Sequence, residues 1–137
     1  MLVIPELRPA GPLGRNIVVA WNATREATRA VHDALPLLTR AAAVTVFAFD
    51  RRAQMMAEEV GRLLDHLGVH GVTADKFTWP DTGEIDAVDA LFSCLSEQGA
   101  DMIVAGGYGH ARMLEHMFGG VTATLIDNLT VPVLLSH

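Results

Sequence analysis

The sequence predicts an α/β fold in which helices cover both faces of a doubly wound, mostly parallel sheet. Short apolar runs rich in β-branched residues alternate with longer segments whose apolar positions recur every three or four residues. Crossover connections that carry a helix join parallel strands, and a parallel sheet is buried on both faces. Apolar residues make up 50% of the 137-residue chain, which supplies one compact core and no second domain.

The first strand and helix of this alternation are predicted at residues 17–21 and 24–42. The strand is a short β-branched run, and the helix has its apolar positions on one face. Pro36 is expected to kink the helix because it removes a backbone donor. The preceding stretch is rich in proline and glycine, so residues 1–14 are interpreted as an extension or linker and residues 15–137 as the domain.

The second unit pairs an apolar strand at residues 44–49 with a helix over residues 55–67. Gly68 is expected to cap that helix at its carboxyl end. A weaker, alternating strand follows at residues 72–78, and the turn residues of segment 79–83 are expected to end it.

The remaining elements complete a five-stranded pattern. A third helix is predicted over residues 85–95 and ends at Gly99, and a fourth strand is predicted at residues 102–105. A glycine-rich turn then leads to a fourth helix over residues 113–128. The last strand is predicted from Val131 to Leu135.

The charge balance and the cysteine content indicate which binding partners and which cellular compartment to expect. Ten Lys and Arg against sixteen Asp and Glu leave a net charge of −6, and the densest basic cluster is Arg51 with Arg52. This balance opposes binding to nucleic acids and to anionic membranes. A lone cysteine, Cys94, an N-terminus without a signal-peptide pattern and apolar runs too short to span a bilayer predict a cytoplasmic protein.

Ligands of open parallel sheets bind beyond the carboxyl ends of the strands, where the strand order reverses. Asn22, Asp50 and Gly106 follow the first, second and fourth predicted strands, so they are candidate binding residues. The glycines after the fourth strand either make a tight turn or turn backbone N–H groups toward a phosphate.

The segment that follows Gly106 offers the other candidates for a phosphate site. Gly109 and Gly119 are separated by nine residues, and Gly119, Gly120 and Val121 can present further N–H groups to the same anion. His110 is either a ligand contact or an exposed loop residue. Arg112 either neutralises a phosphate or lies at the surface.

This spacing resembles the G-2X-G-9X-G-(S/T) nucleotide loop of the universal stress protein family. The resemblance extends to the opening VVAWNATREATRAV and the closing VPVLLSH, and it covers Arg15 to His137. It implies a five-stranded parallel sheet in the order 3-2-1-4-5, a Rossmann-like fold, ATP or AMP as ligand, and a homodimer formed through the strand from Val131 to Leu135.

Two departures from the family pattern predict weak or absent ATP binding. The last position of the loop motif, Ser or Thr in the family, is Gly120 here, so one hydroxyl that would face the phosphates is missing. The Asp that lies near the adenosine in ATP-binding members corresponds to Asn22, which keeps hydrogen-bonding capacity and loses the charge.

The sequence is compatible with three functions. The first is an adenine-nucleotide-responsive regulatory module in the stress response, and the second is a dimeric interaction or scaffold protein of the same fold that binds no nucleotide. The third, slow ATP hydrolysis or phosphotransfer, ranks last because no convincing general base with an orienting partner stands out in the sequence.

Smaller features are interpreted as structural. Cys94 lies on an apolar helical face, which favours a buried thiol over a nucleophile. His66 and His70 are four residues apart, but no Cys or carboxylate completes a zinc site, so no metal is expected. The segment from Leu2 to Ile4 resembles the closing strand of a preceding domain. It is expected either to form an extra strand near Val133 to Leu135, of its own chain or of the partner copy, or to fray.

Overall fold

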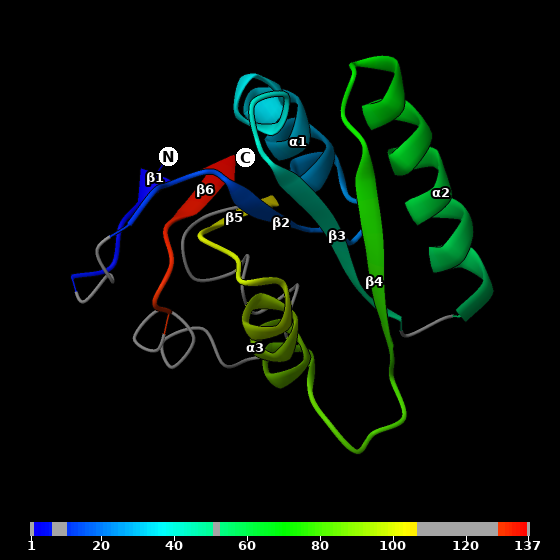
Figure 1. The fold of residues 1–137 in the computed structure, drawn as a ribbon. Coiled ribbons are helices and arrows are strands. Elements are labelled where there is room, and N and C mark those ends of the chain that lie inside the picture. The colour runs from blue at the N-terminus through cyan, green and yellow to red at the C-terminus, as the bar shows by residue number, and fades with distance from the viewer. Residues whose placement is uncertain (1, 7–10, 51–52, 107–128, 137) are drawn as a thin grey trace.

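The computed structural model describes residues 2–6, 11–50, 53–106 and 129–136, which form a six-stranded sheet with helices on both faces (Figure 1). The elements, in chain order, are β1 (Leu2–Val3), β2 (Asn16–Ala20), α1 (Arg25–Leu38), β3 (Ala43–Asp50), α2 (Ala53–Val69), β4 (Ala74–Pro80), α3 (Ala87–Gln98), β5 (Met102–Gly106) and β6 (Val133–Ser136).

The strand order is β1-β6-β5-β2-β3-β4. The five strands β2 to β6 are all parallel to one another, and in their own chain order they read 3-2-1-4-5, as predicted. The additional strand β1 runs antiparallel to β6, with Leu2 opposite Leu134 and Val3 opposite Val133. The N-terminal segment therefore lies along the outer edge of the last strand in the same chain.

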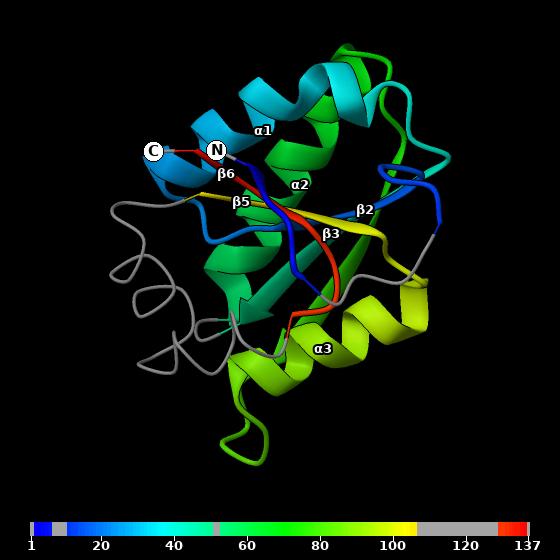
Figure 2. The same ribbon diagram turned by 90° about the vertical axis from the view of Figure 1, so that its left-hand side faces the viewer.

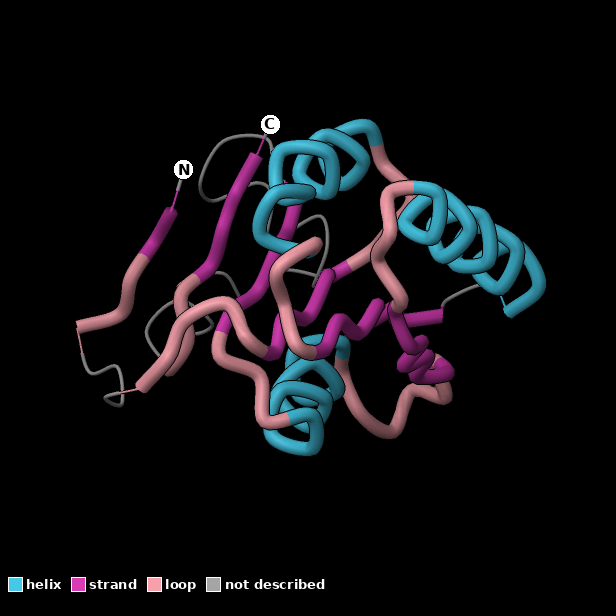
Figure 3. Tube along the Cα trace, turned by 45° about the horizontal axis from the view of Figure 1, so that its top comes forward, coloured by secondary structure: helices cyan, strands magenta, loops and turns pink. Residues whose placement is uncertain are grey.

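Helices α1 and α2 cover one face of the sheet and α3 covers the other (Figures 2 and 3). Strand β2 lies in the middle and is buried on both sides. Ile17 and Val19 join the apolar cluster under α1 and α2, whereas Val18 and Ala20 join the cluster against α3. This burial explains why the strand is a continuous apolar run and does not alternate with polar residues.

Helix starts and strand starts are held by short polar side chains. Thr24 caps α1 by accepting the backbone N–H of Ala27 at 3.2 Å, and Asp86 caps α3 in the same way with Asp89 at 2.8 Å. The carboxylate of Asp101 accepts N–H groups from three consecutive residues, Gly14 to Asn16. This cluster of bonds ties the beginning of the domain to the beginning of β5.

Two predicted boundaries are wrong for identifiable reasons. Helix α2 continues through Gly68 to Val69, and Gly71, with φ of +80°, terminates it, because the N–H of Val72 bonds back to the carbonyl of Leu67 at 2.9 Å.

Strand β4 extends through Trp79 and Pro80, which were expected to break it, and begins at Ala74 instead of residue 72. Proline is tolerated there because β4 is an edge strand of the described sheet and Pro80 is its last residue. The remaining differences are shifts of one or two residues at strand ends and at the starts of α2 and α3, and a shorter first helix, which ends two residues after Pro36. The helix predicted over residues 113–128 lies outside the described residues.

Within the described ranges, no helix combines the length and apolar character that crossing a bilayer requires.

Cys94 is a buried thiol, as predicted. It is fully enclosed in the apolar cluster between α3 and the sheet. Burial, together with a smaller effect of the negative charge of Glu97, raises the pKa of the Cys94 thiol from 9.0 to about 12. The thiolate, which is the reactive form, is therefore suppressed in the folded protein.

We expect Cys94 to be inert toward a thiol-reactive disulfide reagent at about pH 8 while the protein is folded, and to react fully in guanidinium chloride. Above the unfolded pKa of 9.0 and up to the folded value of about 12, the unfolded chain loses this proton and the folded chain keeps it. The free energy of unfolding should therefore fall as pH rises through this window, and less so in Cys94→Ala. Rapid labelling of the folded protein would contradict the assignment.

Candidate functional site

The carboxyl edge of the sheet brings together the ends of three adjacent strands. Asn22 follows β2, Asp50 is the last residue of β3 and Gly106 is the last residue of β5. Because β5, β2 and β3 are neighbours and parallel, these three residues lie at one edge of the sheet. The other predicted site residues lie outside the described part of the chain: Gly109, His110, Arg112, Gly119, Gly120 and Val121.

Asn22 organises the turn between β2 and α1. Its side-chain oxygen accepts the hydroxyl of Thr24 at 2.7 Å and the backbone N–H of Thr24 at 3.3 Å. The side-chain oxygen is thus used by the turn, and the amide nitrogen is the group that distinguishes Asn22 from an aspartate. A ligand at this edge meets a hydrogen-bond donor where an aspartate would offer only acceptors.

The turn also contains a strained residue. Ala23 has φ of +59°, and among the described residues it is the one non-glycine in the left-handed region. A side chain in this region costs about 1 kcal/mol or more. The hydrogen bonds of Asn22 to Thr24 on either side of Ala23 hold the turn in that conformation.

Gly106 allows the first turn of α1 to rest directly on the end of β5. A Cβ atom at this position would lie 2.1 Å from the backbone nitrogen of Ala27 and 2.2 Å from the carbonyl carbon of Glu26. The close approach brings the positive end of the α1 dipole to the carboxyl edge of the sheet. An anion bound at this edge is favoured by that dipole.

The sequence did not predict a second concave region, a groove of about 910 Å³ between α1 and α2. Its polar residues recur at three- and four-residue spacing on the sides of the two helices that line the groove, and this periodicity is the sequence signal that indicates it. Trp21, assigned in the sequence to a buried strand, lies under this groove. In the described part of the chain, no three His, Cys, Asp or Glu residues gather closely enough to hold a metal ion.

No family model matches the sequence, and no curated protein matches it significantly. Solved structures do match the fold. A universal stress protein from Archaeoglobus fulgidus superposes with a TM-score of 0.70 at 18% identity over 90% of this chain. A universal stress protein solved in complex with cAMP gives 0.66 at 21% identity over 90% of this chain, and a family member from Burkholderia pseudomallei gives 0.62 at 22% over 92%.

These likenesses establish that the chain has the universal stress protein fold. The chain spans 44% of the length of the Archaeoglobus protein, 96% of the cAMP-bound protein and 98% of the Burkholderia protein. The chain therefore has the Rossmann-like α/β fold of the universal stress proteins, as the resemblance in the sequence implied.

We expect Gly106→Ala to lower the free energy of unfolding by at least about 3 kcal/mol, because the added methyl group meets backbone atoms that cannot rotate away. Gly61→Ala is the matched control. Gly61 lies inside α2 with open space around its Cα, so alanine should stabilise the protein by about 0.5–1 kcal/mol. Urea unfolding measures both, and equal stabilities of the two variants would disprove the close contact.

Proposed function

We propose that the chain is a cytoplasmic regulatory module of the stress response that binds an adenine nucleotide at the carboxyl edge of β2 and β5. The observation that carries the proposal is the contact of Gly106 with the first turn of α1, which brings a helix dipole to the strand-order reversal of an open parallel sheet. The structural similarity to a universal stress protein in complex with cAMP supports a ligand with an adenine ring and a phosphate.

We assign different parts of the nucleotide to different elements of the fold. We assign the adenosine to the amide N–H of Asn22, because the side-chain oxygen of Asn22 is held by Thr24. The phosphates are assigned to the glycine-rich segment that begins after Gly106 and includes Gly109 and Gly119. With Gly120 in place of a hydroxyl residue, the affinity for ATP should be low.

A second candidate function is a protein-interaction module of the same fold that binds no nucleotide. Gly120 and Asn22 favour it, because they remove a hydroxyl and a charge from the positions that match the family's nucleotide site. Denaturing gently purified protein and identifying any released ATP, ADP or AMP by mass separates the two candidates. Absence of nucleotide, together with no calorimetric binding of AMP or ATP, would reject the first proposal.

We expect Gly120→Ser to bind ATP about tenfold more tightly, because a new hydroxyl adds one hydrogen bond to a charged phosphate. Gly61→Ser, in α2 and away from the carboxyl edge, adds the same hydroxyl where there is open space and should leave the affinity unchanged. Isothermal titration calorimetry compares the two. If ATP binds both variants and the original chain equally, the residue at position 120 does not face the phosphates.

The partner we propose is a second copy of the chain, docked along the strand from Val131 to Leu135. An apolar edge strand is prone to pair with another strand. Here β1 already pairs with Val133 and Leu134 of β6, so β1 competes with the second copy for the same edge. Leu2 is 45% exposed, and β1 is only two residues long, so this intramolecular cover is weak.

We expect deletion of residues 1–6 to shift the monomer–dimer equilibrium toward the dimer, because it leaves the whole edge of β6 open for pairing. Light scattering over a dilution series measures the mass of the full chain and of the deletion variant. A deletion variant that stays monomeric at every concentration would exclude this edge as the dimer interface.

A further inference from the structure

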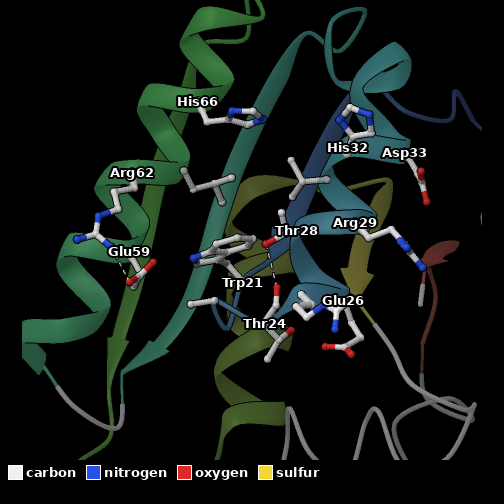
Figure 4. A pocket seen from close by; sticks show the side chains of 14 residues that line it. Trp21, Thr24, Glu26, Thr28, Arg29, His32, Asp33, Glu59, Arg62 and His66 are labelled. Atoms are coloured by element: carbon white, nitrogen blue, oxygen red, sulfur yellow. Dashed lines mark hydrogen bonds and ion pairs between the residues drawn. The ribbon is translucent and has the colours of Figure 1, made fainter.

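The groove between α1 and α2 has an apolar floor and polar rims (Figure 4). Trp21, directly after β2, forms the floor and is 8% exposed, and Val31 and Leu63 flank it from the two helices. Both helices return from the carboxyl ends of neighbouring parallel strands, so they run in the same direction and their facing residues pair in order along the groove.

The floor contains a buried hydrogen-bond donor without an acceptor. The indole nitrogen Nε1 of Trp21 is enclosed and has no hydrogen bond, and among the described residues it is the one buried side-chain polar atom in this state. In Figure 4 the nitrogen-bearing edge of the indole faces the side of the groove where Glu59 and Arg62 lie. An unsatisfied buried donor is unfavourable, and native proteins pair nearly all such groups with protein, water or ligand.

The protein's own carboxylates do not supply that acceptor. Glu59 accepts the guanidinium of Arg62 at 3.0 Å, and Asp33, at the other side of the groove, accepts the hydroxyl of Ser136. Apart from the carboxylate of Glu26, the charged and imidazole side chains on the rest of the rim carry N–H donors. They are the guanidinium groups of Arg25 and Arg62 and the imidazoles of His32 and His66, whose rings are drawn on opposite walls of the groove in Figure 4.

We propose that this groove binds a small aromatic monocarboxylate, at a site separate from the nucleotide edge. The ring of the ligand lies against Trp21, Val31 and Leu63. One carboxylate oxygen accepts the indole N–H of Trp21, and Arg62, which bonds Glu59 through one of its N–H groups, donates another N–H to the ligand.

The charge of the rim sets the class of ligand. Three arginines and three carboxylates line the groove, so its fixed charges cancel. A monoanion that reaches the donors is tolerated, whereas the repeated charges of a triphosphate meet Glu26, Asp33 and Glu59. A cation would leave the indole N–H without an acceptor.

The test uses 2-naphthoate as the probe and 2-naphthamide as its uncharged analogue. Trp79→Phe leaves Trp21 as the sole indole of the two in the chain, so fluorescence quenching reports on the groove. We expect saturable quenching by naphthoate with at least about tenfold weaker binding of the amide, because the charge-assisted hydrogen bond is lost. Equal binding of both probes, or no saturation, would overturn the proposal.

Two variants measured by calorimetry locate the probe. Trp21→Phe keeps an aromatic ring and removes the N–H, and it should weaken naphthoate binding about tenfold. Arg62→Gln, a side chain 70% exposed and therefore tolerant of change, should weaken it several-fold. Trp79→Phe is the matched aromatic control and should leave the affinity unchanged. Binding that survives both Trp21→Phe and Arg62→Gln unaltered would place the probe elsewhere and reject the site.

The nucleotide proposal is tested separately from this one. AMP added in excess should not displace naphthoate, since AMP is assigned to the edge at Asn22 and Gly106. Displacement would show a single shared site and overturn the claim of a separate one. If the chain binds no nucleotide, the naphthoate result still stands, because naphthoate binding is detected through the fluorescence of Trp21.

Discussion

The contact between Gly106 and the first turn of α1 is the constraint on which the rest of the molecule depends. The backbone of β5 and the backbone of α1 meet without a side chain between them. This contact fixes the height of α1 above the sheet and, with it, the position of Thr24 at the helix start. The turn from β2 to α1 must then be short and sharp, which explains a strained Ala23 held by the hydrogen bonds of Asn22.

At the start of that turn, two consecutive residues, Trp21 and Asn22, lie in different surroundings. Trp21 points under the helices and forms the floor of the α1–α2 groove, whereas Asn22 lies at the carboxyl edge of the sheet. The two proposed ligands would therefore contact consecutive residues from different sides. Thr24, which caps α1, and Gly106, which contacts the first turn of α1, lie next to this turn as well.

The two edges of the sheet are protected in different ways. Strand β4 carries Asp75, Lys76 and a terminal proline, which discourage pairing with another strand. Strand β6 is apolar and is instead covered by β1, a strand from the other end of the chain. The charged residues of β4 disfavour pairing in every state of the chain, whereas the edge of β6 becomes available when β1 detaches. We therefore expect self-association at β6.

The sequence by itself determined the alternation of strands and helices, the burial of Cys94 and, through the resemblance, the strand order, because these follow from local periodicity and from motifs along one chain. It also located Asn22 and Gly106 at strand ends. Helix and strand termini at Gly71 and Pro80 depended on position within the sheet and on hydrogen bonds that formed only after packing. The groove, its unpaired indole N–H and the cover on β6 were decided by tertiary structure, since each arises where segments distant in the sequence meet and no local pattern records that meeting.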